Sequence, residues 1–119
     1  PLFEALIDRV NAYRLAYVHF TEPFLPNQLN GVAGALADVA GYFRARCQAP
    51  LLANGGFDQA QAEAWLAEDH CDAVAFGRPF IANPDLPERF RRGAPLNAPD
   101  PETFYQGDEK GYVDYPALA

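Results

Sequence analysis

Residues 72–86 read DAVAFGRPFIANPDL, and this stretch decides the fold. Its first part, 72–76, is a largely apolar run that predicts a buried strand. Gly77 and Arg78 follow where that strand would end. A glycine lets backbone N–H groups approach an anion, and an arginine supplies a fixed fork of donors. The pair therefore indicates a phosphate site at the carboxyl end of a strand.

The same stretch predicts a short helix over 84–92. Asn83 is expected as its N-cap, with Pro84 at the first helical position and Gly93 as a C-terminal stop signal. The positive end of this helix would favour a bound phosphate.

Helix and strand patterns alternate along the rest of the chain. The expected order is helix 2–13, strand 15–21, loop 22–31, helix 32–47, strand 50–53, helix 58–68, strand 72–76 and helix 84–92. Helix 2–13 is amphipathic and needs a partner surface, and Asp58 with Gln61 predicts a capping box. Strands alternating with helices indicate a parallel sheet with right-handed crossovers. Three parallel strands are too few for a closed architecture, so the sequence indicates part of a larger α/β fold.

A second glycine pair, Gly55 and Gly56, follows the strand 50–53. Parallel strands end at the same edge of a sheet, and βα barrels often bind phosphate between the loops after their last two strands. Alone, Gly55-Gly56 is most simply a tight turn and Arg78 a surface ion pair. Together, at consecutive strand ends, the two pairs favour a phosphate site.

Composition narrows the possible functions of the chain. With 119 residues it is expected to form one small domain, and its net charge of -7 makes nucleic-acid binding improbable. Cys47 and Cys71 lack metal-ligand spacing, so we expect no metal site and a reduced, cytoplasmic protein. The sequence contains no apolar run long enough to span a membrane.

Three parts of the sequence resemble the old yellow enzyme family of FMN-dependent ene-reductases, which includes N-ethylmaleimide and xenobiotic reductases. They are 51–57, 72–86 and a tail with Thr-Phe-Tyr at 103–105 and Gly-Tyr-Val-Asp-Tyr-Pro at 111–116. The resemblance implies an α/β chain that is the C-terminal portion of a (β/α)8 TIM barrel, about three βα units plus a tail. Residues 1–119 would form one partial FMN-binding domain, with 94–119 as a wrapping tail.

The resemblance also implies roles for individual residues. Gly55, Gly56, Gly77 and Arg78 match loops that bind the FMN phosphate, and Tyr105 matches a tail tyrosine near the substrate. NADH or NADPH would reduce FMN, which would reduce the activated C=C bond of an enone-type substrate. The family's catalytic residues come from earlier strands. No catalytic residue is therefore expected in this chain, and little or no activity from it alone.

Other polar residues are expected to have structural roles. Glu22 and Asp114 would cap a loop and a turn, and His70 would lie exposed at a polar helix end.

Three functions stay open on the sequence. The chain is a fragment of an ene-reductase, or a truncated non-catalytic α/β module that self-associates and binds no flavin, or an unrelated barrel enzyme for a phosphorylated substrate. Open sheet edges and bare apolar surface predict a homo-oligomer or association with a missing barrel segment.

Overall fold

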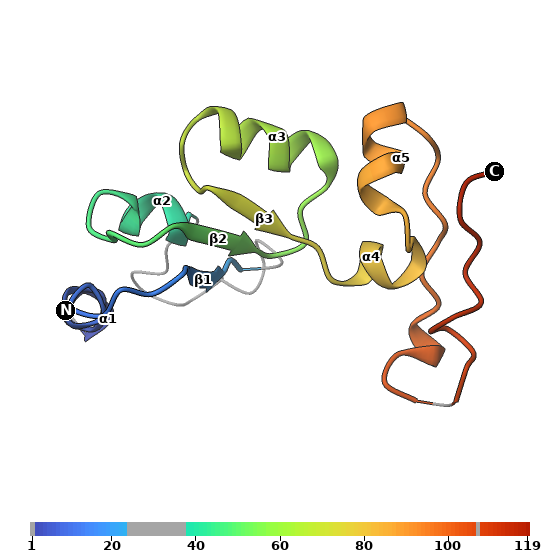
Figure 1. Ribbon diagram of the computed structural model, residues 1–119, viewed down its shortest axis with the longest axis horizontal. Helices are drawn as coiled ribbons and strands as arrows, with labels where there is room; N and C mark the ends of the chain where they lie inside the picture. The colour runs from blue at the N-terminus through green and yellow to red at the C-terminus, as the bar shows by residue number, and fades with distance from the viewer. Residues whose placement is uncertain (1, 24–37, 107) are drawn as a thin grey trace. The chain divides into compact units, whose positions relative to one another are not determined.

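The computed structural model describes residues 2–23, 38–106 and 108–119. The chain divides into two compact units, Pro1–Ala75 and Phe76–Ala119. The first unit contains α1 (Leu2–Val10), β1 (Val18–Thr21), α2 (Val39–Arg44), β2 (Leu51–Asn54), α3 (Gln59–Ala67) and β3 (Ala73–Ala75) (Figure 1). The second contains α4 (Arg78–Ala82), α5 (Leu86–Arg92) and a 3₁₀ helix over Pro101–Thr103.

The first unit is built on a three-stranded parallel sheet in the order β1-β2-β3. Val18 is opposite Leu51, and Ala53 is opposite Val74. The helices α2 and α3 connect the strands, as the alternating sequence pattern predicts. The parallel α/β expectation is therefore confirmed, although β1 and β3 are shorter than predicted and β2 is shifted by one residue.

One face of this sheet carries the apolar core of the unit. Leu51 and Ala53 on β2 are completely buried, and Phe20 on β1 stacks on Phe43 of α2 with ring centroids 5.3 Å apart. His19 on β1 alternates with these positions and is exposed, because side chains point to opposite faces along a strand. Within the described residues, α2 thus covers the face of β1 that carries Phe20, whereas the face that carries His19 is exposed.

Helix α1 is attached to the segment after α2 through polar contacts. Asp8 forms an ion pair with Arg46, and Asn11 donates a hydrogen bond to the backbone carbonyl of Arg46 at 2.8 Å. Leu2, Phe3 and Leu6 remain exposed. The apolar side of this amphipathic helix therefore still lacks a full partner surface.

The capping box expected at the start of α3 is present. The backbone N–H of Gln61 donates to Asp58 Oδ1 at 2.8 Å, and the backbone N–H of Asp58 donates to Gln61 Oε1 at 3.0 Å. By contrast, the helix expected over 32–47 is helical only from Val39 to Arg44 within the described residues. Residues 32–37 of that prediction, and 24–31 of the preceding loop, lie outside the described part of the chain.

The prediction that Asn83 begins a helix over 84–92 is wrong. Asn83 instead follows the end of α4, a helix that the sequence pattern did not predict. The next helix, α5, starts later, at Leu86, with Asp85 as the N-cap residue. The expected stop at Gly93 is confirmed, because this residue has the left-handed φ of 60° that ends the helix.

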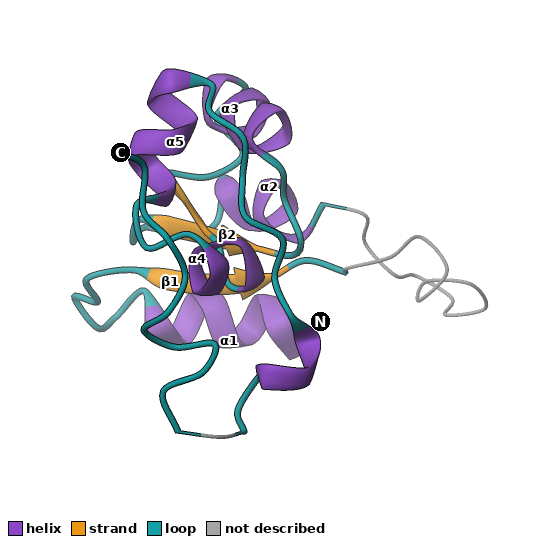
Figure 2. Cartoon of the chain, turned by 90° about the vertical axis from the view of Figure 1, so that its right-hand side faces the viewer, coloured by secondary structure: helices purple, strands orange, loops and turns teal. Residues whose placement is uncertain are grey.

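Residues 94–106 and 108–119 form loops and turns, apart from the 3₁₀ helix that Asp100 caps (Figure 2). Asp114 accepts a hydrogen bond from the backbone N–H of Gly111 at 2.8 Å, which is the turn-capping role expected for it.

Candidate functional site

Gly55 and Gly56 follow directly after β2, where the sequence places them. Both have positive backbone φ angles, 157° and 75°, which residues other than glycine rarely adopt. A Cβ added to Gly55 would lie 2.6 Å from the Cβ of Glu22. The turn therefore requires glycine at Gly55 for conformation and for close packing.

Glu22 is the buried carboxylate against which Gly55 packs. Only 4 % of its surface is exposed, and its two carboxylate oxygens accept hydrogen bonds from the N–H groups of Val39 and Ala40, both at 2.7 Å. Its own N–H donates to the carbonyl of Asn54 at 2.6 Å. Burial raises the pKa of Glu22 above its ordinary value. Glu22 is thus structural, as expected, but it caps helix α2 and supports the glycine turn.

His70 gives α2 a second polar support. Its Nδ1 lies 2.5 Å from Asp38 Oδ2, and the other oxygen of Asp38 accepts from the N–H of Gly41 at 2.7 Å. The ring of His70 also lies 5.1 Å from that of Trp65. His70 is half-buried, so its expected exposure is wrong. The sequence could not reveal this partner, because Asp38 lies 32 residues away.

Gly77 and Arg78 begin the second unit. Gly77 is the N-cap residue of α4 with a negative φ of -93°, and a Cβ added there would meet no atom of the described residues within 4 Å. The Arg78 side chain is exposed and forms no hydrogen bond or ion pair with any described residue. Within the described chain, neither conformation nor packing explains the glycine, and nothing neutralises the arginine.

Tyr105 lies in the tail and is 88 % exposed. Its φ of 58° is in the left-handed region, which is uncommon for a residue with a side chain. Such strain costs about 1–3 kcal/mol and often occurs where a residue contacts a ligand.

The expected site residues are divided between the two units. Gly55 and Gly56 belong to the first, whereas Gly77, Arg78 and Tyr105 belong to the second. The phosphate site that the four loop residues would form together stays a prediction.

Among residues 2–23, 38–106 and 108–119, no group of three His, Cys, Asp or Glu side chains could hold a metal ion. No helix there has the length and apolarity needed to cross a membrane.

Three parallel strands joined by helices define the chain as a segment of a parallel α/β protein. The model of the NADH:flavin oxidoreductase / NADH oxidase family matches residues 2–97. The chain therefore belongs to this family, the old yellow enzyme family, and the resemblance seen in its sequence is confirmed.

Curated relatives include 12-oxophytodienoate reductases from plants. The chain is 36 % identical over 114 residues to 12-oxophytodienoate reductase 2 of Arabidopsis thaliana, covering 95 % of this chain and 30 % of that protein. It is 49 % identical over 77 residues to putative 12-oxophytodienoate reductase 10 of Oryza sativa subsp. japonica, covering 64 % and 24 %.

Solved structures of the family match nearly the whole chain. Morphinone reductase in complex with tetrahydroNAD has a TM-score of 0.83 and 46 % identity, covering 98 % of this chain and 30 % of that one. The old yellow enzyme from Trypanosoma cruzi has a TM-score of 0.85 and 36 % identity, covering 99 % and 30 %. The chain thus spans less than a third of the length of these relatives.

Proposed function

We propose that this chain is the C-terminal part of an FMN-dependent ene-reductase barrel and that it supplies the loops that bind the FMN phosphate. The proposed phosphate ligands are backbone N–H groups at Gly55, Gly56 and Gly77, and the guanidinium of Arg78. The observation that carries the proposal is the exposed Arg78, without a partner in the described chain, directly after a glycine that the chain itself does not require. A ligand that approaches this backbone closely would account for both features.

The donor set fits a phosphate. Amide N–H groups and a guanidinium both donate to phosphate oxygens, and the two-pronged geometry of arginine matches two of those oxygens at once. Bound FMN would supply the hydride transfer from NADH or NADPH to an activated C=C bond. The residues of this chain would bind and orient the phosphate end of the cofactor. The morphinone reductase complex with tetrahydroNAD supports a nicotinamide reductant.

We propose Tyr105 as the residue of this chain that contacts the enone-type substrate. Its exposed ring and left-handed backbone support a ligand contact. The remaining catalytic residues of the whole protein would lie in the part of its relatives that this chain does not cover. We therefore expect little or no ene-reductase activity from the chain alone. We also expect the protein in the cytoplasm, because free thiols such as those of Cys47 and Cys71 stay reduced there.

Association is part of the proposal, because the first unit has an open edge. Strand β1 pairs only with β2 within the described sheet, and beside it lies an apolar groove of about 540 Å³. Its lining includes Phe3 and Leu6 of α1, Val18 and Phe20 of β1, and Phe43 of α2. Unpaired strand edges beside apolar surface promote association. The partner would be a barrel segment of the same family or a second copy of this chain.

Titration with FMN tests the phosphate proposal. The wild-type chain should quench FMN fluorescence on binding, and Arg78→Ala should weaken binding by about 10- to 100-fold, the equivalent of about 1.5–3 kcal/mol for lost charge-assisted hydrogen bonds.

Arg14→Ala is the matched control for this titration. It removes the same charge from another exposed arginine that has no hydrogen bond or ion pair within the described residues. Arg14 lines a depression with Gln48 and Pro50 at the amino edge of the sheet, whereas Gly55 and Gly56 follow the carboxyl end of β2. Removal of the Arg14 side chain should leave FMN affinity unchanged. No FMN binding by the wild-type chain would favour the non-catalytic, self-associating module.

A further inference from the structure

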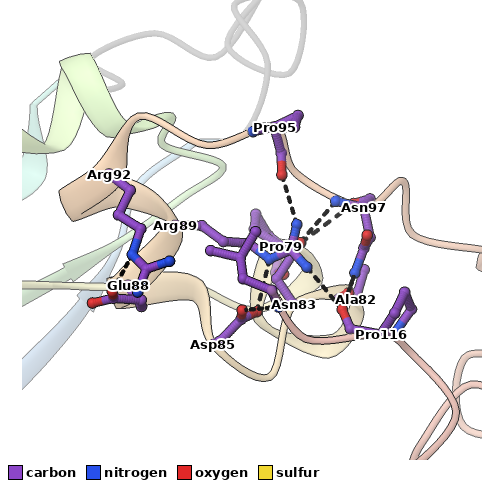
Figure 3. Close-up of polar contacts among 11 residues, drawn as sticks. Pro79, Ala82, Asn83, Asp85, Glu88, Arg89, Arg92, Pro95, Asn97 and Pro116 are labelled. Carbon is purple, nitrogen blue, oxygen red and sulfur yellow. Dashed lines mark hydrogen bonds and ion pairs between the residues drawn. The ribbon is translucent and has the colours of Figure 1, made fainter.

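The second unit is held together by a buried polar cluster, which we call the polar clasp. It joins the side chains of Asn83, Asp85, Arg89 and Asn97 to the backbone carbonyls of Pro95 and Pro116 (Figure 3). Asn83 is completely buried and Arg89 is 4 % exposed. Buried polar groups of this kind are costly unless they are fully paired, and in the clasp they are.

Asn83 and Asn97 form the half of the clasp that holds α4. Asn83 Nδ2 donates to the carbonyl of Pro79 at 2.8 Å, within α4, and Asn83 Oδ1 accepts from the backbone N–H of Asn97 at 2.7 Å. Asn97 Nδ2 donates to the carbonyl of Ala82, the last residue of α4, at 2.8 Å. Helix α4 begins at Arg78, so the clasp anchors the short helix on which the proposed phosphate ligand lies.

Arg89 and Asp85 form the half that holds the end of the tail. Arg89 donates to Asp85 Oδ1, to the carbonyl of Pro95 and to the carbonyl of Pro116, at 2.7, 2.6 and 2.7 Å. The other oxygen of Asp85 accepts from the backbone N–H of Leu118 at 2.7 Å. The Leu118 N–H and the Arg89 guanidinium keep the pKa of Asp85 below its ordinary value, so the carboxylate stays charged.

The two halves meet at Pro116. Its carbonyl accepts from Asn97 Nδ2 at 2.8 Å as well as from Arg89. The segment 98–115 therefore leaves the clasp at Asn97 and returns to it at Pro116, and Tyr105 lies within this segment. One set of hydrogen bonds fixes both α4 and the two ends of the loop that carries Tyr105.

We propose that Asn83 and Asn97 are positioning residues that hold Arg78 and the Tyr105 segment in one framework. The inference rests on the proposed function for its ligands, and it goes beyond that function by coupling the phosphate end of the site to its substrate end. Neither asparagine would touch FMN or substrate. Both would act through the backbone that they fix.

The test uses Asn97→Ala in the full chain. Asn83 is not substituted, because it is completely buried and replacing its side chain would remove several hydrogen bonds at once. Hydrogen exchange is measured first, without ligand. Exchange should accelerate by about tenfold both in 79–83 and in 98–115, because two side-chain hydrogen bonds that fasten these segments are lost. Asn11→Ala is the matched control: Asn11 also hydrogen-bonds backbone groups, those of Arg46 and Gln48, but in the first unit. It should accelerate neither segment.

FMN affinity is measured next, in a double-mutant cycle with Arg78→Ala. Asn97→Ala should weaken FMN binding severalfold in the wild-type background and much less in the Arg78→Ala background, because it acts through Arg78. A residue with a merely structural role would give equal losses in both backgrounds. Circular dichroism checks folding, and Asn97→Ser replaces the alanine variant if that variant unfolds.

Each outcome decides one of the two proposals. Acceleration in only one segment, in neither, or equal FMN losses in both backgrounds would overturn the positioning role. If the wild-type chain binds no FMN, the proposed function fails, whereas the exchange result still decides whether the clasp couples α4 to the tail.

Discussion

Gly55 and Gly77 each follow a strand in the sequence, but they differ in backbone conformation and in the space around their Cα atoms. Gly55→Ala would place a Cβ 2.6 Å from Glu22 at a φ of 157°, whereas Gly77→Ala would place one in open space at a φ of -93°. We expect Gly55→Ala to lower the free energy of unfolding by about 1–3 kcal/mol. Gly77→Ala should change it by less than about 0.5 kcal/mol. Urea denaturation of both variants checks this, and equal losses would contradict the packing described around Gly55.

Glu22 should give the stability of the chain a distinctive pH dependence. Burial raises its pKa in the folded state, so the folded chain holds this proton more tightly than the unfolded chain does. The contribution of Glu22 to stability should therefore fall as pH rises from its ordinary value of 4.5 through the raised value. Glu22→Gln removes the titrating group with little change of shape.

The comparison of wild type with Glu22→Gln isolates this one group. The hydrogen bonds from Val39 and Ala40 and the electrostatic interaction with His70 lower the pKa of Glu22, and the charge of Asp38 raises it. These neighbours are common to both proteins. Unfolding free energies measured across this pH range should show the wild type losing stability relative to the variant as pH rises. Parallel curves would show that Glu22 titrates normally.

For single residues, the sequence predicts the glycine turns but not the distant side chains that pack against them or hydrogen-bond to them. Gly55, Gly56 and Gly93 could be predicted, because glycine at a positive φ leaves a signal in the sequence itself. The sequence pattern places Asn83 at the start of a helix, whereas its side chain bonds to Pro79 and to a distant residue, Asn97, at the end of α4. A side chain that reaches across the fold has no local pattern to reveal it.

Among the elements, α1 and β1 form the open edge of the first unit. Phe3 is 66 % exposed on α1 and lines the apolar groove beside β1. We expect the chain to self-associate at micromolar concentration, and Phe3→Lys to shift it toward the monomer, because a charge in the groove opposes burial.

Leu66→Lys is the matched control for this substitution. Leu66 is also an exposed apolar residue, but it lies on α3 and does not line the groove. It should leave the association unchanged. Sedimentation velocity measures both variants, and a wild-type chain that is already a stable monomer would contradict the expectation.

The local sequence pattern predicts the strands and α3 more closely than it predicts the short helix α4. The strands and α3 appear where apolar runs and the Asp58 capping box predict them. Helix α4 has only five residues, with Pro79 in its first turn, and contacts from Asn83 and Asn97 fix its end. A helix that short depends on tertiary hydrogen bonds more than on its own propensity, so its sequence carried no clear signal.

For the whole molecule, family membership follows from the match over residues 2–97, and the parallel sheet agrees with it. The sequence predicts more than this: a phosphate site that combines a turn of the first unit with the start of the second. Its physical basis is that β2 and β3 are parallel neighbours and end at one edge of the sheet. The guanidinium of Arg78, which has no partner among the described residues, makes that prediction open to direct measurement.

Binding of FMN compared with binding of riboflavin tests the central claim most directly, because the two flavins differ only in the phosphate. We predict that the wild-type chain binds FMN at least about tenfold more tightly than riboflavin, and that Arg78→Ala removes most of this difference. Equal affinities of the wild-type chain for the two flavins would contradict the assignment of a phosphate site.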